Sequence, residues 1–165
     1  MTELADRDEL EGLVKALHRL LSWSVSASTM DAAMRASGFP LEGDQPAFML
    51  LHHVAHLGPS RPSDVADAMK TGRSNVSKIA RRLEDAGLIG RSPDPRDDRQ
   101  VRLRLTEPGQ RIGERVVALS VRHFSVALAD WPAGDVRELR RLMIILSHSL
   151  RSAPPTHSGA DPDAP

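Results

Sequence analysis

The sequence of 165 residues contains no cysteine. Disulfide bonds, thiolate metal sites and cysteine-based redox switches are therefore excluded. The N-terminal residues are acidic and lack the basic start and apolar stretch of a secretory signal. The longest apolar run, Leu142–Leu146, is far shorter than a membrane span. We therefore expect a cytoplasmic protein without a membrane partner, and a chain of this length fits one domain.

The sequence also lacks a net charge, because 22 Lys and Arg residues balance 22 Asp and Glu residues. This balance would argue against a nucleic-acid partner, where a basic surface is expected. The charges are unevenly placed, however: residues 61–104 hold eleven basic and seven acidic residues, a local excess of +4. Such asymmetry indicates that this segment faces an anion while the rest of the chain does not.

Apolar residues recur at three- and four-residue steps near both ends of the chain, which is typical of amphipathic helices. We expect a first helix over residues 8–37 and a second over residues 44–56, with Asp44 as its N-cap. Two further helices are expected within residues 107–152. Residues 153–165 are rich in Pro, Gly, Ser and Asp, and are expected to be disordered.

The middle of the chain predicts a helix-turn-helix followed by a β-hairpin. Pro62 opens a short helix, Thr71-Gly72 makes a turn, and a further helix runs over residues 73–85 until Gly87 ends it. Residues 88–91 and 101–105 are predicted strands that flank a charged loop, 92–100. The predicted fold class is mainly α, an α+β winged helix. Its winged helix-turn-helix lobe covers residues 44–106, and helices from both chain ends, 8–37 and 107–152, form a dimerisation region.

The helix over residues 73–85 separates a buried stripe from a polar outward face. At about 100° per residue, Val76, Ile79, Ala80 and Leu83 form the stripe. Residues 73–82 contain no acid, and their outward side chains are of the types that bond to base edges and phosphates in a major groove. The predicted DNA-binding residues on this helix are Arg73, Ser74, Asn75, Ser77, Lys78, Arg81 and Arg82.

The charged hairpin is expected to reach the neighbouring minor groove. A narrow, A·T-rich minor groove has an enhanced negative potential that attracts arginine, and Arg96 near the hairpin tip is the candidate for insertion. Asp97 and Arg99, which complete the predicted DNA-binding set, are expected to pair within the loop and stiffen it. This pairing would explain why acids lie so close to a polyanion.

Five segments together resemble the MarR family of bacterial transcription regulators. They are Arg61-Pro62-Ser63-Asp64-Val65-Ala66, Asn75-Val76-Ser77-Lys78, Arg82-Leu83-Glu84-Asp85-Ala86-Gly87-Leu88-Ile89, the hairpin Asp94-Pro95-Arg96-Asp97-Asp98-Arg99, and Leu105-Thr106-Glu107-Pro108-Gly109. The resemblance implies a single domain over residues 1–152, a homodimer, and repression relieved by a small aromatic or anionic ligand. Independently, the long amphipathic helices at both ends favour a twofold dimer. Such a dimer predicts a pseudo-palindromic operator, with recognition helices about 34 Å apart.

Histidines and aromatic residues raise alternative interpretations. His52 and His56 are four residues apart and His53 lies beside them, so a metal-responsive regulator is one alternative. No cysteine or nearby acid completes such a site, and we therefore predict no metal and no cofactor. Trp23, Phe48, His52 and His56 are candidate ligand-binding residues, although core packing explains Trp23 and Phe48 equally well. No catalytic motif is present, so an enzyme is not expected; a winged helix that binds protein is a further alternative.

Overall fold

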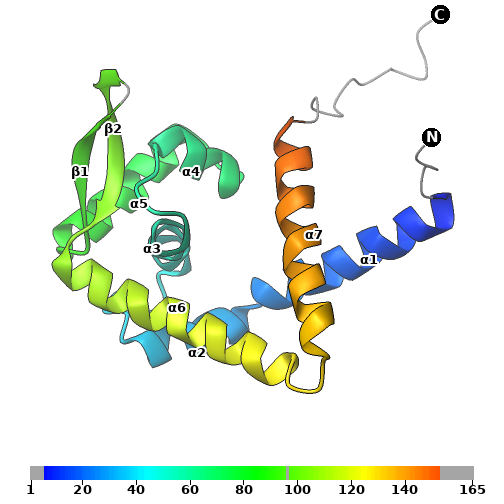
Figure 1. Cartoon of the computed structure of the whole chain (residues 1–165). Helices are drawn as coiled ribbons and strands as arrows, with labels where there is room; N and C mark the ends of the chain where they lie inside the picture. Colours follow the sequence, from blue (N-terminus) through cyan, green and yellow to red (C-terminus); the bar gives the residue numbers. More distant parts are fainter. Residues whose placement is uncertain (1–5, 96, 153–165) are drawn as a thin grey trace, which may run out of the picture. The chain divides into compact units, whose positions relative to one another are not determined.

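The computed structural model describes residues 6–95 and 97–152. It is mainly helical with one antiparallel hairpin, which confirms the predicted fold class (Figure 1). The chain divides into two compact units, Met1–Arg122 and His123–Pro165. Arg96 and residues 153–165 lie outside the described residues. The elements in order are α1 (Arg7–Ser24), α2 (Ala27–Ser37), α3 (Gln45–Leu57), α4 (Pro62–Ala68), α5 (Arg73–Asp85), β1 (Ile89–Asp94), β2 (Asp97–Leu105), α6 (Glu107–Ala127) and α7 (Ala133–Ser152).

The N-terminal segment forms two helices, so the prediction of one helix over residues 8–37 was wrong. Ser26 is the N-cap of α2, and its hydroxyl accepts a hydrogen bond from the backbone N–H of Thr29. The Ser24 hydroxyl donates to the carbonyl of Leu21 in the last turn of α1. Serine and threonine side chains compete in this way with helical backbone hydrogen bonds. The helix therefore breaks at a serine-rich run, even though apolar spacing continues on both sides.

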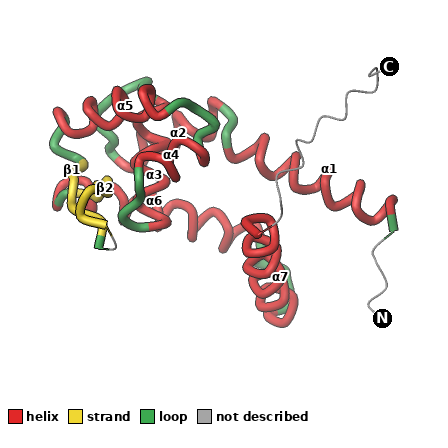
Figure 2. Tube along the Cα trace, turned by 90° about the horizontal axis from the view of Figure 1, so that it is seen from above, coloured by secondary structure: helices red, strands yellow, loops and turns green. Residues whose placement is uncertain are grey.

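Helices α3, α4 and α5 lie together in the first unit (Figure 2) and supply most of its core. Asp44 caps α3 as predicted, and Gly58 follows its last residue. The predicted stripe of α5 is confirmed, because Val76, Ile79, Ala80 and Leu83 are at most 1% exposed. Full burial of an aliphatic side chain stabilises a fold by about 1.5–3 kcal/mol. These four residues therefore pack one side of α5 against the core and leave the opposite side exposed to solvent.

The hairpin is longer than predicted, because β1 reaches Asp94 and β2 begins at Asp97. Ile89 pairs with Leu105 and Pro93 with Val101, and the register becomes irregular between Pro93 and Asp94. Strand β1 is at the sheet edge, where the missing N–H of a proline is tolerated. On the other side of β2, Ser60 and Leu103 exchange two backbone hydrogen bonds of 3.1 and 2.9 Å. The loop before α4 is therefore attached directly to the wing.

The motif L-T-x-x-G joins the hairpin to α6. The Thr106 hydroxyl accepts from the N–H of Gly109, and the Thr106 N–H donates to the carbonyl of Leu88 at 3.0 Å. A Cβ atom at Gly109 would lie 1.9 Å from that same carbonyl oxygen. Farther along α6, a Cβ at Gly113 would lie 3.1 Å from the Cβ of Ala55 on α3. Glycine is thus required where α6 starts and allows close approach where α6 crosses α3.

Helices α1 and α7 keep their apolar residues exposed within the single chain. Helix α1 has no buried residue, and Leu10, Val14 and Leu21 are 50%, 63% and 62% exposed. In α7, Leu142 and Leu150 are exposed to a similar extent. The dimerisation role of these helices and the single-domain boundary at residue 152 stay predictions. No helix in the described ranges is long and apolar enough to cross a membrane.

Candidate nucleic-acid interface

The outward face of α5 carries the polar residues that the helical periodicity assigned to it. The predicted residues Arg73, Ser74, Asn75, Ser77, Lys78, Arg81 and Arg82 are all exposed. Two of the short side chains bond locally: the Asn75 amide donates to the Thr71 hydroxyl at 2.9 Å, and the Ser77 hydroxyl donates to the Arg73 carbonyl at 3.0 Å. These bonds leave the Asn75 side-chain oxygen and the Ser77 lone pairs available as acceptors. The face therefore presents both donors and acceptors at fixed positions.

Apart from Arg96, which lies outside the described residues, the basic residues between positions 61 and 104 fall into two groups. Carboxylates of the protein neutralise four of them, Arg61, Arg82, Arg91 and Arg102. Six others make no ion pair with the residues that the structure describes, and these are Lys70, Arg73, Lys78, Arg81, Arg99 and Arg104. The unpaired cations lie on the turn before α5, on α5 and on β2. A surface of this kind attracts an external polyanion.

Arg82 differs from its neighbours on α5, because its guanidinium has a partner within the protein. Its Nε and Nη2 donate to the two carboxylate oxygens of Asp44 at 2.6 and 2.9 Å. The same carboxylate accepts the N–H of Ala47 and so caps α3. Hydrogen bonding to Arg82 lowers the pKa of Asp44 below its usual value and raises the pKa of Arg82. Arg82 thus ties α5 to the start of α3, and its contact with DNA stays a prediction.

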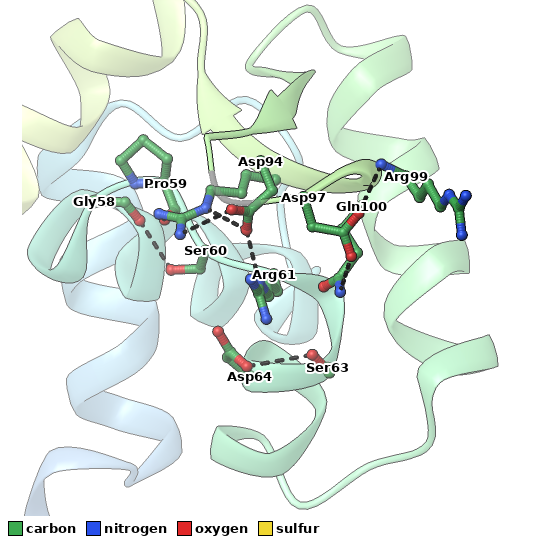
Figure 3. A network of polar contacts seen from close by, with 11 residues as sticks. Gly58, Pro59, Ser60, Arg61, Ser63, Asp64, Asp94, Asp97, Arg99 and Gln100 are labelled. Carbon is green, nitrogen blue, oxygen red and sulfur yellow. Dashed lines mark hydrogen bonds and ion pairs between the residues drawn. The ribbon is translucent and has the colours of Figure 1, made fainter.

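A buried carboxylate at the end of β1 was missed by the sequence analysis (Figure 3). The Asp94 side chain has no exposed surface, and its Oδ2 accepts from Arg61 Nε at 2.6 Å and from Arg102 Nε at 2.8 Å. Arg102 also donates to the carbonyl of Pro59 at 3.4 Å. The hydrogen bond to Asp94 raises the pKa of Arg61. No sequence pattern links Arg61 to Asp94, since 33 residues separate them.

Asp97 stiffens the hairpin, although not through the predicted side-chain pair with Arg99. Its Oδ1 accepts the backbone N–H of Arg99 at 3.0 Å, and its Oδ2 accepts from the Gln100 amide at 2.8 Å (Figure 3). The guanidinium of Arg99 is exposed and takes no part in this contact. Two acids of the wing are therefore occupied within the protein, and the Arg99 cation remains available to a ligand. The predicted insertion of Arg96 lies outside the described residues.

The candidate ligand residues occupy different environments. Phe48 is fully buried and packs edge-to-face against Phe39, with ring centres 5.2 Å apart, as the core-packing alternative predicts. His52 and His56 stack on each other with centres 4.2 Å apart, and Trp23 lies on α1 with 40% of its surface exposed. The pKa of His52 falls to about 4, because surrounding atoms desolvate its charged form and the cations of His56 and His53 would repel it. In the described part of the chain, no group of three or more His, Asp or Glu side chains is arranged to hold a metal ion.

A groove of about 570 Å³ lies along α6, and sequence reasoning did not find it. Its walls include Ala55 of α3, Leu105 of β2 and the apolar residue Val117, with polar groups from Glu114 and Arg122. None of the four predicted ligand residues lines this groove. Its existence depends on how α6 packs against α3, which the spacing of residues along the chain does not reveal.

The fold and the exposed polar face of α5 define a winged helix-turn-helix protein. Residues 44–101 match the model of the MarR family. This match covers about a third of the chain and agrees with the resemblance that the sequence motifs indicated. The match covers the predicted lobe almost completely, from the cap of α3 to the middle of β2.

Two relatives are named as regulators. The chain is 26% identical over 109 residues to the HTH-type transcriptional repressor IacR of Pseudomonas putida, which covers 66% of this chain and 65% of the relative. It is 33% identical over 99 residues to a putative transcriptional regulatory protein for the hcr operon of Thauera aromatica. This match covers 58% of this chain and 60% of the relative. The matched region therefore spans less than two thirds of either relative.

Solved structures share the fold over nearly the whole chain. A MarR family protein from Bacillus stearothermophilus superposes with a TM-score of 0.65 at 20% identity, covering 89% of this chain and 99% of the other. A MarR transcriptional regulator from Methanosarcina mazei Go1 gives 0.62 at 18% identity, covering 87% and 99%. Both structural matches therefore extend beyond residues 44–101 to most of the chain.

Proposed function

We propose that this protein is a sequence-specific, double-stranded-DNA-binding transcription regulator. The observation that carries the proposal is the outward face of α5, where Lys78 and Arg81 are exposed and make no ion pair with the described residues. The regulator acts by binding and not by catalysis, and its DNA target places it in the cytoplasm. Names of the two relatives, one a repressor, support a repressor.

In this proposal α5 lies in the major groove. Arg81 and Lys78 reach guanine edges or phosphates, while Asn75 and the serines bond to bases or to the backbone. The wing lies along the adjacent minor groove and presents Arg99, and Arg96 inserts there as the sequence predicts. Phosphate contacts set the position on the duplex, and base contacts supply specificity.

A second copy of the chain completes the regulator. The apolar residues of α1 and α7 are exposed in the single chain, and apolar patches of this kind mark interaction surfaces. Burying them against the same helices of a partner copy gives a twofold dimer. The two α5 helices then read half-sites about 34 Å apart, so the operator is pseudo-palindromic.

A small ligand in the α6 groove controls DNA binding in this proposal. The groove volume of about 570 Å³ falls within the range of ligand pockets. Its walls are apolar, and Arg122 offers a cation to an aromatic or anionic ligand. Release of DNA requires that the ligand bind more tightly to the arrangement that does not fit the operator. Filling the groove by Ala118→Trp should abolish release by such ligands without weakening operator binding in their absence.

The interface is tested by substitutions on α5 with matched controls on α1. Sites selected from random DNA provide the probe, and affinities are measured at one fixed salt concentration. Lys78→Ala and Arg81→Ala should each weaken binding by about 1–3 kcal/mol. Lys15→Ala and Arg7→Ala remove the same residue types from the exposed surface of α1 and should leave the affinity unchanged. Wild-type affinity in both α5 variants would show that this face does not read DNA.

A protein-binding winged helix remains the alternative function from the sequence analysis. It predicts that no site is enriched from random DNA and that any residual DNA binding lacks sequence preference. The unpaired cations of α5 favour DNA, because a polyanion satisfies several of them at once.

A further inference from the structure

We propose that Asp94 is a positioning residue for DNA recognition, which holds the wing at a fixed place relative to the helix-turn-helix. The inference rests on the proposed function, because it concerns how the two DNA-contacting elements are kept in register. Asp94 itself is fully buried and does not touch DNA.

Three segments of the chain meet at this carboxylate. Asp94 ends β1, Arg102 comes from the middle of β2, and Arg61 is the residue directly before α4. Both arginines donate to the same oxygen, Oδ2, at 2.6 and 2.8 Å. A buried carboxylate is tolerated only when it is paired and hydrogen-bonded, and these two guanidinium groups supply such partners to Asp94.

The position of Asp94 along the hairpin lets its contacts with Arg61 and Arg102 influence the orientation of the hairpin tip. The regular strand register ends between Pro93 and Asp94, and the bonds of Asp97 act only within the hairpin tip. The hairpin ladder therefore does not by itself fix the angle at which the tip leaves the sheet. The bond between Asp94 and Arg61 supplies that constraint, because it joins the irregular point to the start of α4.

The arginines of this cluster also differ from the DNA-facing cations. The side chains of Arg61 and Arg102 are 31% and 28% exposed, and their charges are shared with Asp94. Arg99 is exposed and makes no ion pair with the residues that the structure describes. Removing the Asp94 charge should therefore leave Arg99 and the exposed cations of α5 in the protein, release the charges of Arg61 and Arg102, and alter where the wing carries Arg99. Binding is weakened because the wing must be ordered when DNA binds.

A double-mutant cycle separates positioning from general destabilisation. Affinity for a selected DNA site is measured for the wild type, Asp94→Asn, Arg99→Ala and the double variant. The same cycle with Arg81→Ala in place of Arg99→Ala is the control, because Arg81 lies on α5. Substitutions at residues that act through one another change the binding free energy non-additively, whereas the changes from independent sites add.

We expect Arg99→Ala to weaken binding about tenfold in the wild type and less than about threefold in Asp94→Asn. Arg81→Ala should weaken binding by the same factor in both backgrounds. If Asp94→Asn does not fold, Arg61→Gln takes its place in both double-mutant cycles. This substitution removes one of the two arginine partners of Asp94, and Arg61 is partly exposed. Equal factors for Arg99→Ala in both backgrounds, including no loss in either, would overturn the proposal. Absence of any specific DNA binding by the wild type would instead refute the proposed function.

Discussion

Replacing Gly109 by alanine tests how the wing is joined to α6. The new Cβ atom would lie 1.9 Å from the Leu88 carbonyl oxygen and 2.9 Å from its carbon, so Leu88 or the first turn of α6 must move by more than about 1 Å to restore ordinary contact distances. Overpacking of this kind costs about 1–3 kcal/mol or more. The displacement also breaks the hydrogen bond from Thr106 to Leu88, at about 1 kcal/mol. We expect a loss of about 2–4 kcal/mol in the free energy of unfolding.

Urea or thermal unfolding of the purified variant measures this loss. Gly12→Ala is the matched control, because Gly12 is also a helical glycine and a Cβ atom there would meet nothing within 4 Å. The control should gain about 0.5–1 kcal/mol from the higher helix propensity of alanine. A Gly109→Ala protein within about 0.5 kcal/mol of the wild type, which is the ordinary scatter of surface substitutions, would refute the close contact at Leu88.

Three further outcomes are expected. Lys70 has a positive φ of 49°, where glycine is favoured, so Lys70→Gly should raise the free energy of unfolding by about 0.5–1 kcal/mol, measured as a higher Tm. Asp44→Ala removes the cap of α3 and the partner of Arg82 and should cost about 1–2 kcal/mol in urea unfolding. Between pH 6.5 and about 4 the unfolded state takes up the His52 proton more readily than the folded state, so stability falls as the pH falls through this window. His52→Gln should reduce that dependence, and an unchanged pH profile would contradict the shifted pKa.

Periodicity and end signals were sufficient to predict the recognition helix. The spacing of Val76, Ile79, Ala80 and Leu83 defines one side of a helix without reference to the rest of the protein, and all four are buried. The start of α3 was equally predictable, because the Asp44 side chain caps a backbone N–H three residues away. Features that depend on local hydrogen bonds or helical geometry can be derived from the sequence.

Features that depend on contacts between distant segments could not be derived. In the sequence, Asp94 is one of several acids in a charged segment. Its burial and its contact with Arg61 become visible only in the folded structure. Arg82 fits the outward face by angle, yet Asp44 occupies its guanidinium from 38 residues away. The break between α1 and α2 was missed for a local reason, because apolar spacing was given more weight than the capping hydroxyl of Ser26.

The salt dependence of operator binding tests the central claim most directly. Six basic residues of the lobe make no ion pair with the described residues. If half of them contact phosphates in each copy of a dimer, the slope of log K against log salt is about −5, since each phosphate contributes about −0.9. The account predicts such a slope on a selected pseudo-palindromic site, with a smaller slope for Lys78→Ala. An affinity that does not change between about 50 and 200 mM salt would contradict DNA binding by this lobe.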